Sequence, residues 1–127
     1  MNKILLFLLL SFSVFSFAFA QGSKDDMITA LKSGNADQFV KYFDNNIDVK
    51  LPSSNEMKSV PKAQAAATVK SFFADNKITS CAITSQRENG GTMYVAGKLS
   101  GTGSYNITVM VKSDGNNADI ITLRINN

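Results

Sequence analysis

The segment ALKSGNADQFVKYF, residues 30–43, indicates two short helices that meet at a glycine. Gly34 follows the first helical stretch, at a position where a glycine commonly ends a helix by adopting the left-handed conformation. Asn35 is the expected cap of the second helix, because its side chain can accept a hydrogen bond from a free backbone N–H. Phe39 and Phe43 are four residues apart in that second helix and therefore share one face. We expect this aromatic face to lie over the apolar interior of the fold.

Helical and extended patterns follow one another along the rest of the chain. Ser23, Asp25 or Asp26 can cap the first helix, and Ser59 is a candidate cap for a third. The remaining elements that we expect are a strand at 47–51, a loop at 52–60, a helix at 62–76 and strands at 79–87, 92–99, 104–112 and 118–126. An Asn-Gly pair at 89–90 and an Asp-Gly pair at 114–115 mark turns between the last strands, which predicts an antiparallel meander. This order predicts an α+β fold with the helices on one side of a curved sheet.

The N-terminus has the three parts of a secretory signal peptide. Lys3 supplies a positive start, an apolar run follows at 4–17, and small residues stand at Ala18 and Ala20. We expect cleavage after Ala20, which leaves a single domain at 21–127 in the periplasm or outside the cell. The alternative is a retained membrane anchor, which is disfavoured because the apolar run is short for a membrane span and no basic stop follows it. After cleavage we expect no stable membrane anchor.

Charge and composition argue against several classes of function. The chain carries 13 Lys and Arg residues against 10 Asp and Glu, and the basic residues are spread singly, so no basic cluster of the kind that binds nucleic acid is present. The absence of histidine removes Ser-His and Cys-His catalysis and the commonest transition-metal ligand. Asp44, Asn46 and Asp48 match the start of a calcium loop, but Val49 stands where that loop needs glycine. We expect neither a metal nor a cofactor, and we expect Cys81 to be a small core residue.

Four stretches together resemble the nuclear transport factor two-like superfamily, also called cystatin-like. They are the helix pair in ALKSGNADQFVKYF, the strand IDVKL at 47–51, the helix end KSFFADN at 70–76 and the final strand ITLRIN at 121–126. Within that superfamily the chain is most similar to a family of small exported bacterial proteins, domain of unknown function 4783. The resemblance implies a sheet curled around the long helix to make a cone with an apolar pocket. Some members of the superfamily are isomerases or dehydratases, many only bind, and many pair through their sheets, so the resemblance implies no single activity.

Five aromatic residues are the candidate ligand-binding residues. If the cone leaves a gap between helices and sheet, these residues line a pocket for a small apolar molecule, and otherwise they form a solid core. They are Phe39, Tyr42, Phe43, Phe72 and Phe73. We therefore expect a non-enzymatic domain that binds a small apolar molecule or a protein partner.

Two alternative functions remain open at this point. An isomerase or lyase of the same fold needs a carboxylate base and a hydrogen-bond donor that face each other in an apolar site. Asp119 shares strand parity with apolar residues of the last strand and is the candidate base, with Tyr94 or Tyr105 as the donor. The other alternative is a structural dimerisation module. Tyr94, Ala96 and Met110 place apolar side chains on the outer face of the meander, which predicts weak homodimers formed sheet to sheet.

Overall fold

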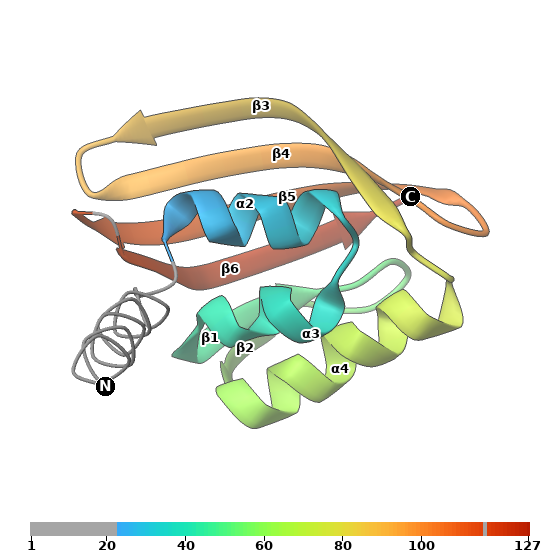
Figure 1. The fold of residues 1–127 in the computed structure, drawn as a ribbon. Helices are drawn as coiled ribbons and strands as arrows, with labels where there is room; N and C mark the ends of the chain where they lie inside the picture. The colour runs from blue at the N-terminus through green and yellow to red at the C-terminus, as the bar shows by residue number, and fades with distance from the viewer. Residues whose placement is uncertain (1–22, 116) are drawn as a thin grey trace, which may run out of the picture.

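A layer of helices covers one face of a curved sheet (Figure 1). The computed structural model describes residues 23–115 and 117–127, so the predicted signal peptide at 1–20 lies outside the described residues. In chain order, the elements are α2 (Lys24–Lys32), α3 (Ala36–Phe39), the 3-10 turn η2 (Val40–Tyr42), β1 (Phe43–Lys50), β2 (Met57–Pro61), α4 (Lys62–Asp75), β3 (Ser80–Asn89), β4 (Thr92–Ser100), β5 (Ser104–Asp114) and β6 (Asn117–Asn126). The predicted α+β class is confirmed.

The six strands of the described residues form one sheet in the order β2-β1-β6-β5-β4-β3. Strands β1 and β6 pair in parallel, and all the other neighbours pair antiparallel. The last four strands form the predicted meander. The helices all lie on the same side of the sheet (Figure 1). The opposite side, called the outer face below, has no helix over it in the described part of the chain.

The junction between α2 and α3 follows the sequence prediction. Ser23 caps α2 in a capping box with Asp26. Gly34 has a φ of +65°, the left-handed conformation that ends α2. The Oδ1 atom of Asn35 accepts a hydrogen bond from the backbone N–H of Gln38 at 3.2 Å. Each of these contacts joins residues only a few positions apart, so the local sequence is sufficient to specify them.

Phe43 belongs to a strand, so the prediction of a helical stripe that reaches this residue is wrong. Helix α3 is a single turn, and after η2 the chain becomes extended, with a ψ of 138° at Phe43. Strand β1 therefore begins four residues before the expected start at Ile47. Phe43 pairs with Ile120 in the parallel β1–β6 ladder. That pairing is a long-range contact, which short-range periodicity does not contain.

Residues 57–61 form strand β2, although the sequence predicts a loop there. Strand β2 pairs antiparallel with β1, and only Val60 among its side chains is buried, so no alternation of apolar residues marks it. Ser59 is not the predicted helix cap. Its φ is +51°, and its backbone N–H donates to Oδ1 of Asp48 at 2.8 Å. Helix α4 begins at Lys62 without a side-chain cap.

A β-bulge in β6 reverses the expected facing of its first residues. Two consecutive residues of β5 pair with Thr122 and Ile120, which leaves Ile121 between them without a partner on β5. One unpaired residue moves every side chain beyond it to the opposite face. Ile120 and Ala118 consequently face the core. Asp119 lies on the outer face, so its predicted inward orientation is wrong.

Candidate functional site

Three of the five predicted ligand-binding residues pack on one another in the core. The ring of Phe39 meets that of Phe43 edge to face, with centroids 5.9 Å apart. Phe39 also stacks on Phe73 of α4, with centroids 6.5 Å apart. Phe39 is fully buried and Phe43 is 2% exposed. The three rings thus pack together between α3, β1 and α4.

The other two aromatic candidates lie at the margin of this core. Phe72 meets Tyr105 of β5 edge to face, with centroids 5.2 Å apart. The hydroxyl of Tyr105 donates to Oδ1 of Asn76 at 2.9 Å, a contact that ties β5 to the end of α4. Tyr42 is half-buried beside α2, and desolvation, followed by the charge of Asp26, raises its pKa. Phe72 and Tyr105 thus contribute ring packing, and Tyr105 and Asn76 a hydrogen bond, between α4 and β5.

Two hollows flank α3 among the described residues. The larger has a volume of about 460 Å³ and lies between α3 and the end of α4. Phe73 and Ile78 contribute its apolar lining, and Asp37 and Lys70 its charged lining, with Lys70 Nζ 3.8 Å from Asp37 Oδ1. The smaller, of about 390 Å³, lies between α2 and α3 and includes Tyr42. The larger hollow combines apolar surface with charged groups, as small-molecule sites commonly do.

The three candidate catalytic residues are not brought together. Asp119 and Tyr94 lie on the outer face, on strands that are separated by β5. With about 4.8 Å between neighbouring strands and an offset of two residues along them, their backbones are roughly 12 Å apart. Tyr105 lies on the core side and bonds Asn76. Within the described residues no polar or charged residue is buried, and Asp119 is half-buried.

Cys81 is a core residue, as its alternation with apolar neighbours indicates. Its side chain is 5% exposed. Desolvation raises the pKa of its thiol from the ordinary 9.0 to about 11, against a smaller lowering effect of a backbone hydrogen bond from Lys98. The neutral thiol is a poor nucleophile, so burial gives Cys81 no activation at neutral pH.

Across residues 23–115 and 117–127, no three His, Cys, Asp or Glu side chains are grouped so that they can hold a metal ion. None of the helices in these same ranges has the length and apolar character needed to span a membrane.

The outer face carries the apolar patch that strand parity predicts. Tyr94 and Met110 are directly opposite each other in the β4–β5 ladder, and Ala96 is the next outward residue along β4. We call these three residues the Tyr94 patch. Tyr94 is 37% exposed and is the one exposed large hydrophobic side chain among the described residues. An aromatic ring with a polar tip is typical of residues at protein interfaces.

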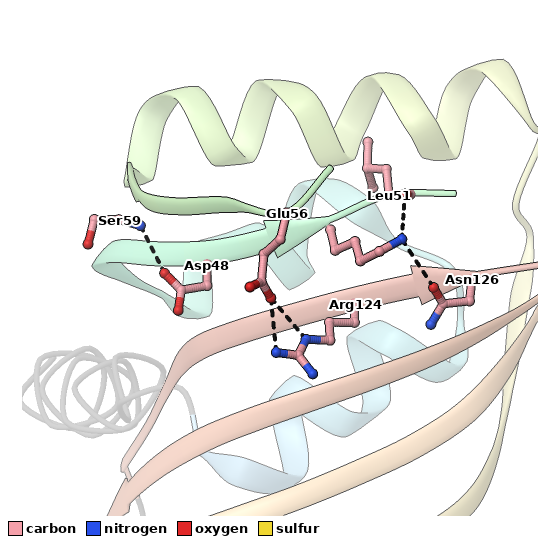
Figure 2. A network of polar contacts seen from close by, with 7 residues as sticks. Asp48, Leu51, Glu56, Ser59, Arg124 and Asn126 are labelled. Carbon is pink, nitrogen blue, oxygen red and sulfur yellow. Dashed lines mark hydrogen bonds and ion pairs between the residues drawn. The ribbon is translucent and has the colours of Figure 1, made fainter. Parts of the chain in front are cut away.

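Polar contacts occupy the other end of the outer face, over β1 and β6 (Figure 2). Glu56 accepts a hydrogen bond from Nε of Arg124 at 3.0 Å and lies 2.9 Å from its Nη2 atom. The ammonium group of Lys50 donates to Oδ1 of Asn126 at 3.5 Å. These contacts fasten the β1–β2 connection to β6. The part of the outer face over β5, β4 and β3 lies outside this group of polar contacts.

A family model described as Domain of unknown function (DUF4783) matches residues 24–126. The chain belongs to the DUF4783 family. Its fold is similar to the crystal structures of DUF4783 proteins from Bacteroides ovatus (24% identity, 85% of this chain and 97% of that chain covered, TM-score 0.74) and Bacteroides uniformis (23% identity, 82% and 95% covered, TM-score 0.72). It is also similar to an NTF-2 like protein of unknown function from Shewanella oneidensis (11% identity, 80% and 90% covered, TM-score 0.57). No functionally curated protein matches the sequence. The expected family is confirmed, and the fold is similar to that of the NTF-2 like protein.

The sequence did not indicate two charged features of this DUF4783 domain. Lys70 and Asp37 meet from different helices at the larger hollow, and no local motif joins them. Arg87 lies opposite Tyr94 in the β3–β4 ladder, beside a hollow of about 290 Å³ that also includes Glu88 and Asn89. The strand pattern alone places Arg87 on a strand but does not place that strand at the edge of the sheet.

Proposed function

We propose that this chain is an exported, non-enzymatic domain that binds protein through the outer face of its sheet, including a second copy of itself. The observation that carries the proposal is the Tyr94 patch, in which Tyr94 is exposed and Ala96 and Met110 are half-buried, on a sheet face over which the described residues place no helix. The packing of Phe39, Phe43 and Phe73 against one another favours a protein partner over a small molecule held inside the cone. The signal-peptide pattern at 1–20 supports export.

Self-association of the mature chain tests this proposal. Sedimentation at micromolar concentrations is expected to show a weak, concentration-dependent dimer. Tyr94→Lys places a charge in the apolar patch and should shift the chain to monomer. Lys98→Ala is the matched control, since Lys98 lies on the same face of β4 but outside the patch, and it should leave the dimer intact. A monomer at every concentration would refute the proposal.

The larger hollow supports a second candidate function, which is the binding of a small amphipathic molecule. Its volume of about 460 Å³ falls in the range of known ligand sites, and Phe73, Ile78 and Lys70 offer apolar contact and a positive charge. A hydrophobic anionic dye should bind the native protein and raise its melting temperature. Ala74→Phe fills the hollow and should abolish binding, whereas Ala67→Phe, on the same helix but outside the hollow, should not. Dye binding that survives Ala74→Phe would exclude this site.

A further inference from the structure

The two edges of the sheet differ in how well they are protected from further strand pairing. Strand β2, at one edge, has five residues, includes Pro61, which has no N–H to donate, and has Ser59 at a φ of +51°. Strand β3, at the other edge, has ten residues and contains no proline. Within the described ranges no strand pairs with its far side. Strand β3 is therefore the open edge of the sheet, visible along the top of Figure 1.

The β3–β4 turn determines which backbone groups point away from the sheet. Gly90 and Gly91 both have a φ of +54°, as a two-residue hairpin turn of type I′ requires, and Asn89 pairs with Thr92 across it. In an antiparallel ladder the backbone groups of successive residues point alternately toward and away from the partner strand. Since Asn89 closes the turn, residues 86 and 88 direct their N–H and C=O groups to the open edge. A β-bulge at Thr84 limits this regular stretch to residues 85–89.

The charged side chains at this edge differ between the two faces of the sheet, with an acidic residue on the core side and a basic residue on the outer face. Glu88 forms an ion pair with Lys24 of α2 on the core side of the sheet. Arg87 is exposed on the outer face and takes part in none of the ion pairs found among the described residues. Its guanidinium group lines the hollow of about 290 Å³ beside Tyr94. A permanently positive side chain at this hollow favours a negatively charged neighbour.

We propose that residues 85–89 of β3 bind an extended segment of another protein, which adds to the sheet as an antiparallel strand and carries an acidic residue opposite Arg87. The backbone groups of Gln86 and Glu88 form the new ladder. The residue opposite Arg87 is then in a non-hydrogen-bonded pair, in which facing side chains come closest. Its carboxylate meets the guanidinium over the hollow beside Tyr94. The inference shares with the proposed function the premise that the chain binds protein.

Charge argues against a second copy as the occupant of this edge. An antiparallel pair of β3 strands centred on Arg87 places two arginines directly opposite each other, and a pair centred on Glu88 places two glutamates opposite each other. A partner strand with one acidic residue avoids both repulsions. In these two registers the edge complements an acidic segment better than it complements a second copy.

Binding of short synthetic strands to the mature, isotope-labelled chain tests the inference. The probes are capped peptides of alternating threonine and valine with one central glutamate, glutamine or lysine. The glutamate peptide should slow hydrogen exchange at the amides of Gln86 and Glu88, and the glutamine peptide should bind roughly two- to fivefold more weakly. Arg87→Glu should reverse the preference from the glutamate peptide to the lysine peptide. Gln86→Pro removes an outward N–H and should abolish binding of all three, whereas Gln86→Ala should not.

Each outcome bears on one proposal. If no peptide slows hydrogen exchange at the amides of Gln86 and Glu88, the edge inference is overturned. The proposed function would still stand in that case, provided that the chain forms a dimer which Tyr94→Lys disrupts. Peptide binding that is indifferent to the residue at position 87 would overturn the acidic preference. Loss of self-association in Gln86→Pro would show that β3 pairs with a second copy, contrary to the inference. Peptide binding by a chain that never dimerises would support the edge site and refute the function proposed for the Tyr94 patch.

Discussion

Replacement of Gly34 by alanine should be far more damaging than replacement of a glycine with the same backbone conformation in an open turn. Gly34 has a φ of +65°, and a side chain in the left-handed region costs about 1–2 kcal/mol. A Cβ atom at Gly34 would also lie 2.6 Å from the carbonyl carbon of Thr79 and 2.9 Å from the backbone nitrogen of Ser80. Both atoms belong to the backbone at the start of β3 and cannot rotate away. Overpacking of this kind adds about 1–3 kcal/mol, so Gly34→Ala should lower the free energy of unfolding by about 2–5 kcal/mol.

Gly90→Ala is the matched control for this prediction. Gly90 has a φ of +54°, but an added Cβ would meet no atom within 4 Å. It therefore carries the conformational cost of about 1–2 kcal/mol without the clash. Urea denaturation of the wild-type chain and both variants measures the difference. Equal destabilisation by the two substitutions would refute the reasoning, because it would show that close approach of the α2–α3 junction to β3 contributes nothing.

Three further predictions concern the core, the cysteine and the N-terminus. Phe43→Ala should lower the free energy of unfolding by about 3–5 kcal/mol in the same urea assay, since the side chain is 2% exposed and packs on Phe39; a loss below about 1 kcal/mol would contradict its place in the core. The pKa of Cys81 is raised from 9.0 to about 11, so the thiol of the unfolded chain loses its proton at a lower pH than the thiol of the folded chain. The contribution of the neutral thiol to stability is therefore complete below pH 9 and should be lost as the pH rises to 11. Cys81→Ala should show a shallower loss of stability over that range, and an identical pH profile would exclude the effect. Intact-mass measurement of exported protein should find Gln21 as the first residue, whereas a mass that includes residues 1–20 would contradict cleavage after Ala20.

The sequence by itself determined the features that depend on near neighbours. The cap at Ser23, the left-handed Gly34 and the cap at Asn35 each involve contacts within one helical turn. The Tyr94 patch was also predictable, because β4 and β5 run in register without a bulge from residue 92 to residue 112, so that alternation holds along both. Where two strands pair without a bulge, side chains alternate between the two faces as the sequence predicts.

Only the tertiary structure decided the features that depend on which strands meet. The bulge at Ile121 turned Asp119 to the outer face and so separated the candidate carboxylate from the core. Phe43 is a strand residue that pairs with Ile120 of β6, and residues 57–61 are a strand that pairs with β1. The edge position of Arg87 follows from the strand order, which no local pattern in the sequence encodes. In each case the deciding energy comes from backbone pairing between distant segments, and a single unpaired residue is enough to exchange the two faces of a strand.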